Sequence, residues 1–306
     1  MRSTKEWHSP LRRRCNAWLL TRPGLLNRLG ASLTVVDVYG APGDTIITAT
    51  ICRKLHRRFP RLRLNCITSN PELLLHDPNI QTLNQPEDFL SVWSWYYEIG
   101  ASKDGQSNLL SKTLKRMGLE VEAGDYRARL FLTDEERHRG KQLLGACGRP
   151  VLTFHTRSRS PEKNWPLERW RVALQELERH FHLVHLGDDT EPELPQVQRF
   201  AGKLGLRESL TLMAQSQVHV GSVSFLMHAA NGLNVPSVII YGGRETPANS
   251  GYEENINLFA QMPCGPCWLP YKPGDRCPHA VACMEQISPA DVVAAVYRQA
   301  RLLQAT

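Results

Sequence analysis

The sequence predicts an α/β protein made of two doubly wound units, each built on a parallel sheet. Short runs rich in β-branched residues alternate with longer stretches of helical pattern, which is typical of βαβ units. This alternation occurs once before and once after Arg149-Pro150 in the 306 residues. A domain usually holds about 100–200 residues, so the length also favours two domains.

The first unit opens with a buried-strand pattern at residues 33–39, which ends in the glycine-containing loop 40–44. A helix is expected over 45–59, stopped by Pro60, and a second strand over 62–67. The remaining elements expected in this unit are a strand over 80–83 and helices over 107–117 and 134–144.

The second unit repeats this order and places polar loops directly after its strands. We expect strands over 151–155, 182–186, 218–220 and 235–241, and helices over 166–180, 210–214, 226–233 and 289–303. In doubly wound sheets ligands bind at the carboxyl ends of the strands, so the loops there are the candidate site.

The charge of the chain is concentrated at its start. Residues 1–30 hold seven of the 37 basic residues and one of the 30 acidic residues, so the rest is nearly neutral. This distribution argues against a nucleic-acid groove in the fold. The basic arm suits either an anionic membrane surface or solvent, and both interpretations stay open. No apolar run approaches the ~20 residues of a membrane span, and we expect a cytoplasmic protein.

Three loops carry groups suited to an anionic ligand. In loop 40–44, Gly43 allows close backbone approach and Asp44 is either a catalytic carboxylate or a helix cap. Segment 156–166 combines hydroxyls with cations, which suits a diphosphate but also an ordinary solvated loop. Segment 221–228 offers serine donors at a helix start, followed by His228, which is either a core or a site histidine.

Taken together, these segments resemble glycosyltransferase family 9, the lipopolysaccharide heptosyltransferases. The resemblance covers about residues 33–300 and rests on four segments at the family's spacing. They are the loop 40–44, the lysine and Trp-Pro motif in 163–170, the serine/histidine helix and small-residue turn in 222–236, and the cysteine segment 264–289. Each segment alone is a weak signal, whereas all four in this order are fairly specific.

The resemblance implies a GT-B fold, in which two Rossmann-like domains face each other across a cleft. The expected organisation is a basic arm over 1–30, an acceptor-binding domain over 31–149, a nucleotide-sugar-binding domain over 150–288 and a closing helix over 289–306.

The resemblance also implies an inverting sugar transfer from a nucleotide-diphosphate donor, with no catalytic cofactor or metal. Asp44 matches the general base, and Lys163 matches the cation that stabilises the departing diphosphate. The absence of an Asp-x-Asp motif fits a metal-independent transferase. The residues expected to bind the donor are Gly43, Thr156, Ser158, Glu191 at the ribose, Ser222, Ser224 and His228.

One departure from the family bears on the substrate. Val223 and Phe225 stand where the family has an aspartate, which contacts the donor sugar, and a glycine. The resemblance implies an ADP-heptose-like donor as the leading candidate, and this departure leaves the sugar open, as the sequence also leaves the nucleotide base. The acceptor it implies is a lipopolysaccharide core or another glycan. The alternative is a catalytically degenerate sugar-nucleotide-binding protein, against which Asp44 and Lys163 argue.

Four cysteines follow the pattern Cys-x2-Cys-x9-Cys-x5-Cys at Cys264, Cys267, Cys277 and Cys283. This spacing suits a tetrahedral thiolate site for structural zinc or iron, since four protein ligands leave no open position. A reduced structural loop is the alternative. Only Lys272 and Arg276 are basic between the cysteines, so a nucleic-acid-binding zinc module is not expected.

Overall fold

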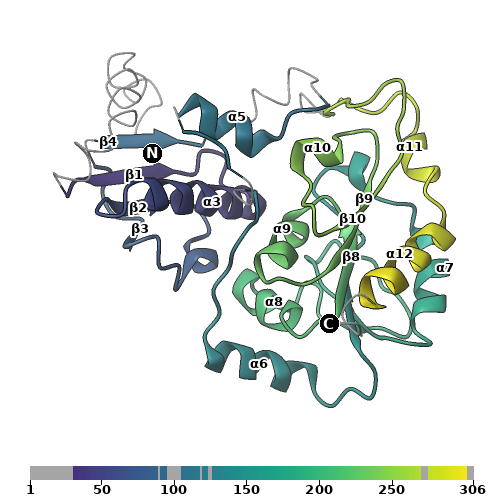
Figure 1. Ribbon diagram of the computed structural model, residues 1–306. Coiled ribbons are helices and arrows are strands. Elements are labelled where there is room, and N and C mark those ends of the chain that lie inside the picture. The colour runs from purple at the N-terminus through teal and green to yellow at the C-terminus, as the bar shows by residue number, and fades with distance from the viewer. Residues whose placement is uncertain are drawn as a thin grey trace.

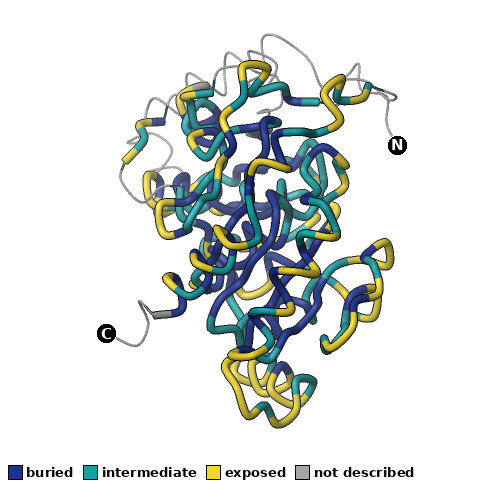
Figure 2. The backbone as a smooth tube through the Cα atoms, turned by 90° about the vertical axis from the view of Figure 1, so that its right-hand side faces the viewer, coloured by how far each residue is buried: buried dark blue, intermediate teal, exposed yellow. Residues whose placement is uncertain are grey.

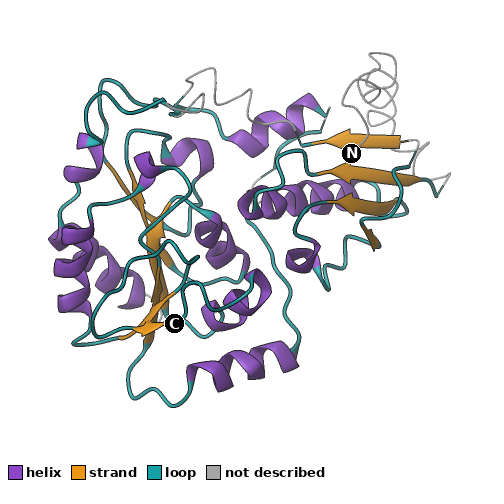
Figure 3. Cartoon of the chain, turned by 180° about the vertical axis from the view of Figure 1, so that it is seen from behind, coloured by secondary structure: helices purple, strands orange, loops and turns teal. Residues whose placement is uncertain are grey.

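The computed structural model describes residues 30–88, 90–94, 105–117, 119–122, 126–269 and 275–301. Within these residues the chain forms two parallel sheets flanked by helices (Figures 1 and 3). The predicted basic arm lies outside the described residues except for Gly30. No helix in the described ranges has both the length and the apolar character needed to cross a membrane.

The first sheet has the strand order β3-β2-β1-β4. Its strands are β1 (Ser32–Val36), β2 (Arg63–Ile67), β3 (Thr82–Leu83) and β4 (Leu90–Trp93). The three central residues of β1 and of β2 are buried, as expected for parallel strands covered on both faces. Its helices are α3 (Pro42–Arg58), a 3-10 helix η2 (Pro71–Leu74) and α5 (Leu109–Arg116).

Helix α3 begins three residues earlier than the sequence predicts. Ala41 is its N-cap and Pro42 its first residue, because proline needs no hydrogen-bond partner there and has helical φ already. Asp44 therefore lies in the first helical turn and not at the cap itself. The negative charge faces the positive end of the helix dipole.

The second sheet has the order β10-β9-β8-β5-β6-β7. Its strands are β5 (Val151–Phe154), β6 (His182–His185), β7 (Gln198–Arg199), β8 (Val218–Ser222), β9 (Ser237–Tyr241) and β10 (Ile256–Phe259). Its helical elements are η3 (Pro161–Lys163), α7 (Leu167–Leu177), α8 (Leu206–Met213), α9 (Phe225–Gly232), α10 (Pro247–Ser250), α11 (Ala282–Glu285) and α12 (Pro289–Arg301).

Each sheet has one point at which the strand order reverses. In the first sheet the chain moves from β1 to β2 on one side and returns to β4 on the other. In the second it moves from β5 to β6 and returns to β8. Ligands bind outside the carboxyl ends of the strands at such reversal points. The loops after β1, β5 and β8 are therefore in the positions that the fold reserves for a site.

The two units share one hydrophobic cluster. Helices α8 and α9 cover the face of the second sheet that looks toward the first unit, and α7 and α12 cover the opposite face (Figure 1). Buried residues of α3, such as Ile46 and Leu55, belong to the same cluster as Leu226 and Met227 of α9. Figure 2 shows the buried residues running through the centre of the molecule. Contact between α3 and α9 thus fixes the position of the two units relative to each other.

Helix α6 (Asp134–Leu144) connects the two units and has the bounds that the sequence predicts. Thr133 and Glu136 form a capping box at its start. Arg207 of α8 donates to Glu136 Oε1 over 2.6 Å and to the carbonyl of Phe131 over 2.6 Å. Gly140 is buried where α6 crosses α8, and a Cβ atom there would overlap the carbonyl of Thr211.

Gly140→Ala is expected to destabilise the protein by about 1–3 kcal/mol, because the added methyl group has no space against Thr211. Helix propensity alone would give the opposite sign, a gain of about 1 kcal/mol. Urea unfolding at 25 °C measures the difference. Gly148→Ala, which adds a methyl group to open space, is the matched control. A Gly140→Ala protein as stable as wild type would contradict the close helix contact.

Candidate active site

A cavity of about 710 Å³ opens between the two units at the carboxyl ends of the strands. Its volume is in the range of small-molecule and cofactor sites. Seven of the residues predicted for the site line it: Gly43, Asp44, Ser158, Lys163, Glu191, Ser224 and His228. The fold thus brings together one carboxylate from the first unit and polar groups from several loops of the second.

Two predicted hydroxyls do not line this cavity. Thr156 is buried, and its hydroxyl donates to Glu191 Oε2 over 2.6 Å. Ser222 is the last residue of β8 and is fully buried, and its hydroxyl has no hydrogen-bond partner in the described part of the chain. The sequence pattern identifies a hydroxyl-rich loop but not the side of the backbone on which each hydroxyl lies. Neither side chain is placed to hold a phosphate in the cavity.

Asp44 has an unusually high pKa for a carboxyl group. Burial, together with the charge of nearby Asp37, raises the pKa of Asp44 to about 7. A hydrogen bond with the backbone of Ala41 and the charges of Lys163 and Arg159 oppose this rise. The helix-cap interpretation of Asp44 is wrong, since Ala41 is the N-cap, and Asp44 lies in the first turn of α3 and lines the cavity.

Asp37 holds the loop that carries Asp44, and the sequence analysis missed it. Its carboxylate accepts hydrogen bonds from Thr45 Oγ1 (2.7 Å), Thr68 Oγ1 (2.8 Å) and the Gly40 N–H (3.1 Å). Gly40 has φ +64°, and a Cβ atom there would lie 2.7 Å from Ser69 Oγ. The available signal was a carboxylate directly after the first strand, at a sheet reversal point.

Lys163, which is partly buried, forms an ion pair with buried Glu245 at an Nζ–Oε1 distance of 2.5 Å. Glu245 also accepts from Ser250 Oγ (2.7 Å) and from Arg244 (3.1 Å). Burial favours the neutral carboxyl, but Lys163 and Arg244 outweigh burial and lower the pKa of Glu245 to about 2. Burial lowers the pKa of Lys163, and the charge of Glu245 opposes that change.

Glu245 is the second functional candidate that the sequence analysis missed. It follows β9, at the same edge of the second sheet as the loops after β5 and β8. The signal for it was the position of a charged pair, Arg244-Glu245, after a predicted strand and two glycines. The sequence alone did not show that Lys163 would lie beside it.

Glu191 is buried, and its acceptor positions are used within the chain. It accepts from the N–H groups of Thr156 (3.1 and 3.0 Å) and Arg157 (3.0 Å), from the Thr156 hydroxyl and from His185 Nε2 (2.9 Å). An ionised carboxylate has about four lone-pair positions, so these bonds fill it. Burial would raise the pKa of Glu191, but His185 and the neighbouring donors lower it. In this geometry Glu191 fixes the loop after β5.

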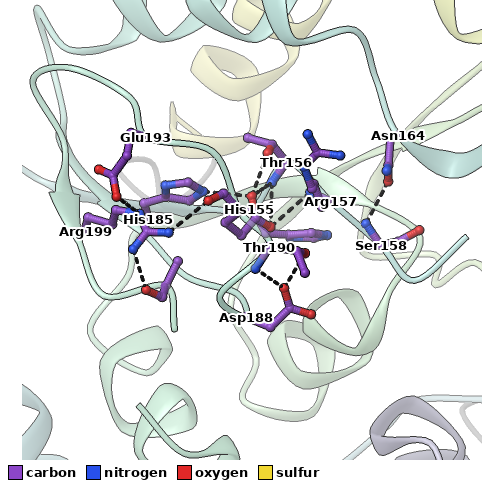
Figure 4. Close-up of polar contacts among 12 residues, drawn as sticks. His155, Thr156, Arg157, Ser158, Asn164, His185, Asp188, Thr190, Glu193 and Arg199 are labelled. Atoms are coloured by element: carbon purple, nitrogen blue, oxygen red, sulfur yellow. Dashed lines mark hydrogen bonds and ion pairs between the residues drawn. The ribbon is translucent and has the colours of Figure 1, made fainter. Parts of the chain in front are cut away.

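The loop between β5 and α7 forms the cationic wall of the cavity. Arg157, Arg159 and Lys163 all line it. Figure 4 shows Ser158 facing Asn164, whose Oδ1 accepts from the Ser158 N–H over 2.7 Å. Below this loop, Asp188 accepts two hydrogen bonds from Thr190 (Figure 4). The concentration of positive charge suits an anion with several oxygens, such as a diphosphate.

Helix α9 packs against the first turn of α3 beside the cavity. Ser224 is its N-cap and accepts from the Leu226 N–H over 3.1 Å. His228 Nδ1 bonds the hydroxyl of Tyr252 over 2.7 Å, and burial lowers the pKa of His228 to about 4. A Cβ atom on Gly43 would lie 3.1 Å from His228 Cδ2, so glycine at 43 allows the two helices to approach closely.

The four predicted metal-ligating cysteines do not form a metal site in the described residues. No three His, Cys, Asp or Glu side chains within those ranges are grouped to hold an ion. Cys264 is exposed, whereas Cys283 is buried beside Gly242. Burial and the neighbouring thiols of Cys277 and Cys264 raise the pKa of Cys267. The structural zinc or iron predicted at these four cysteines therefore stays a prediction.

Comparisons with known proteins agree with this class of fold. Heptosyltransferase II of E. coli aligns with 15% identity and a TM-score of 0.63 over 89% of this chain and 99% of its own. A family 9 glycosyltransferase of Veillonella parvula gives 15% identity and a TM-score of 0.64 over 88% and 97%. The iron-containing dodecameric glycosyltransferase TibC from enterotoxigenic E. coli aligns with 20% identity and a TM-score of 0.70, over 89% of this chain and 76% of its own. A search of curated proteins by sequence found no match.

The two facing parallel sheets and the cavity between them define a GT-B glycosyltransferase fold. Residues 103–269, more than half of the chain, match the model of glycosyltransferase family 9 (heptosyltransferase). The chain belongs to this family. It is therefore a glycosyltransferase of the heptosyltransferase family.

Glu245→Gln is expected to lower the free energy of unfolding by about 1–3 kcal/mol at pH 7, because the partly buried ammonium of Lys163 loses its counter-charge. Removing both charges in Glu245→Gln/Lys163→Met should recover much of this loss. Glu253→Gln, a matched change at an exposed carboxylate, should have an effect below about 0.5 kcal/mol. Urea unfolding measures all three variants.

The same ion pair makes the free energy of unfolding depend on pH. The folded-state pKa of Glu245 is about 2 against an ordinary value of 4.5, so its contribution is complete above pH 4.5. The contribution is lost as the pH falls from 4.5 toward 2, and the cost of Glu245→Gln should fall with it. A cost that is the same at pH 7 and pH 3 would contradict the ion pair.

Proposed function

We propose that the protein is an inverting glycosyltransferase that moves a sugar from a nucleotide-diphosphate donor to a glycan acceptor. The observation that carries the proposal is that Asp44 lines the same cavity as Arg157, Arg159 and Lys163. Family membership supports sugar transfer as the reaction. ADP-heptose is the leading donor, since TibC has a structure in complex with ADP-D-β-D-heptose.

The diphosphate of the donor is proposed to bind along Arg157, Arg159 and Lys163. The N-terminus of α9 with Ser224 supplies neutral hydrogen-bond donors on the same wall. Ser158 donates its N–H to Asn164 and its hydroxyl to the Ser160 carbonyl, so it joins them only by releasing one of these bonds. The alternation of charged and neutral donors matches the oxygens of a diphosphate. The ribose role predicted for Glu191 requires it to give up part of its internal hydrogen bonding.

In the proposed reaction Asp44 acts as general base. Its carboxylate takes the proton from an acceptor hydroxyl while that oxygen forms a bond to the anomeric carbon of the donor sugar. The bond from this carbon to the diphosphate breaks on the opposite side, and the electron pair leaves with the diphosphate. Attack from the side opposite to the leaving group inverts the anomeric centre.

Lys163 is proposed to stabilise the charge that develops on the leaving diphosphate. A cation that is already held in place costs no reorganisation when the bond breaks. Glu245 supplies this positioning through its 2.5 Å contact with Nζ. Because Lys163, Arg157 and Arg159 together provide the positive charge, we propose that the reaction needs no catalytic metal ion. Iron in TibC is a property of that protein.

The acceptor is proposed to bind on the other side of Asp44. That wall is lined by Tyr39, Ile47, Leu109 and Trp268, which form a small apolar cluster of their own. Ile47 lies one helical turn after Asp44 on α3, so the cluster adjoins the carboxylate. Apolar and aromatic faces suit the C–H face of a sugar ring. A lipopolysaccharide-core glycan at the cytoplasmic side of the inner membrane, reached through the basic arm, is the proposed acceptor.

A catalytically degenerate sugar-nucleotide-binding protein is the second candidate. Val223 and Phe225 favour it, since both line the cavity where the resemblance places an aspartate and a glycine. This candidate binds the donor but gives no turnover. Both candidates predict nucleotide binding, so turnover with a sugar nucleotide is the measurement that separates them.

A thermal-shift screen with ADP, UDP, GDP and CDP tests donor binding. A nucleotide at about 100 times its dissociation constant stabilises the folded state by about 2.7 kcal/mol, which raises the melting temperature visibly. We expect a selective shift with ADP. A selective shift with another nucleotide would mean a different donor and the same class of reaction. If no nucleotide raises the melting temperature of the folded protein, both candidates are overturned.

Turnover should depend on the ionisation of Asp44. Since the pKa of Asp44 is about 7, kcat/KM is expected to rise as the pH increases from 6 to 8. Asp44→Asn should lower kcat by about 10²–10⁴-fold and leave the Kd for ADP within about twofold. Steady-state assays with ADP-heptose and calorimetry measure the two quantities. Asp134→Asn, an exposed carboxylate on α6, is the control. Wild-type turnover in the Asp44→Asn protein would exclude Asp44 as the general base.

A further inference from the structure

A continuous row of buried hydrogen bonds leads from the cavity into the second sheet. Ser224 Oγ bonds His155 Nε2 over 2.8 Å, and His155 Nδ1 bonds His219 Nε2 over 3.2 Å. His219 Nδ1 then bonds Thr153 Oγ1 over 3.1 Å, and Thr153 accepts from Ser216 Oγ over 2.9 Å. The row crosses the central strand pair, since Thr153 and His219 are partners in the register of β5 and β8.

The two imidazoles are neutral and therefore carry one N–H each. Both rings are buried, and burial lowers the pKa of His155 to about 4 and the pKa of His219 well below its ordinary value. Their planes are nearly parallel, at 11°. A neutral imidazole donates from one nitrogen and accepts at the other, so the row has a direction.

Thr153 fixes this direction. The Thr153 hydroxyl oxygen accepts a hydrogen bond from Ser216 Oγ. Among the hydrogen bonds of the described residues, the acceptor for the Thr153 hydroxyl proton is His219 Nδ1. Thr153 is fully buried, and a buried hydroxyl proton without an acceptor is costly. Thr153 therefore donates to His219. It follows that His219 donates from Nε2 to His155 Nδ1, and that His155 donates from Nε2 to Ser224.

The direction of the row determines what Ser224 offers to the cavity. Its oxygen accepts from His155 Nε2 and from the Leu226 N–H, and these two bonds use both of its lone pairs. Its proton is the part left for a ligand. Ser224 lines the cavity and is not fully buried. A hydroxyl held in this way recognises a group that only accepts hydrogen bonds, such as a phosphate oxygen.

Gly221 provides the space for this arrangement. A Cβ atom at 221 would overlap the ring of His155. The position is in β8, between His219 and Ser224, where a larger residue would displace the ring from both of its partners. Glycine at 221 therefore leaves the space in the sheet that the imidazole of His155 occupies.

We propose that His155 and His219 are positioning residues that hold Ser224 as a hydrogen-bond donor to the diphosphate of the donor substrate. The proposal deepens the proposed function and rests on it. His155 acts through Ser224 and does not itself need to contact the reacting atoms. The ligand class that the row selects is an unprotonated phosphate or diphosphate.

The binding test uses inorganic pyrophosphate and ADP with wild type, His155→Phe, His155→Gln, Ser224→Ala and the double variant His155→Phe/Ser224→Ala. We expect His155→Phe and Ser224→Ala each to weaken pyrophosphate and ADP binding by about tenfold, and the double variant to be no worse than either. Glutamine carries an N–H near the position of Nε2 and should restore most of the affinity. Binding of adenosine, which has no phosphate, should not change.

His182→Phe, at the opposite end of the second sheet, is the matched control and should leave pyrophosphate binding unchanged. Independent, additive effects of His155→Phe and Ser224→Ala would overturn the proposal while leaving the proposed function intact. Failure of wild type to bind pyrophosphate or any nucleoside diphosphate would overturn the proposed function, and this inference with it.

A second measurement on wild type does not depend on a variant folding. Nitrogen-15 NMR of the histidine side chains reports which ring nitrogen carries the proton. We expect the Nε2–H tautomer for both His155 and His219. The Nδ1–H tautomer at His155 would reverse the row and overturn the proposal, because Ser224 would then spend its proton on His155.

Discussion

The close contact between α3 and α9 is the constraint on which the rest of the site depends. Gly43 removes the side chain that would separate the first turn of α3 from the ring of His228. As a result Asp44, which belongs to the first unit, faces the serine-capped start of α9 in the second. The shared hydrophobic cluster behind both helices fixes this distance, so the carboxylate and the cationic wall are positioned by core packing.

Around this contact two carboxylates each raise the pKa of a neighbouring group, with opposite results for the charge of that neighbour. Asp37 shapes the loop of Asp44 and also raises its pKa. Glu245 likewise acts to raise the pKa of Lys163, where the same effect favours the charged ammonium against burial. One buried carboxylate thus makes its neighbour easier to protonate, and another keeps its neighbour charged. Pairs of titratable groups pushed apart in this way are typical of acid–base sites.

Much of the fold could be predicted from the sequence, because β-branched runs and proline or glycine boundaries mark its elements. α6 has the expected bounds, and the βαβ order gives both parallel sheets. The missed strands include β7, which has only two polar residues, too few for a periodic pattern. In the site, the pattern identified Asp44 and Lys163 in the cavity wall but not Glu245, Asp37 or His155. Those three depend on which loops meet in space, and local spacing does not contain that information.

The continuous core behind α3 and α9 also bears on how substrates enter and leave. Swinging the two units apart as rigid bodies would separate Ile46 and Leu55 of α3 from Leu226 and Met227 of α9 and expose apolar surface to water. A ligand of the cavity would therefore exchange more easily through local movement of the polar loops at its mouth than through a hinge between the units. In this architecture the packed helices hold Asp44 in place, and the loops control access to the cavity.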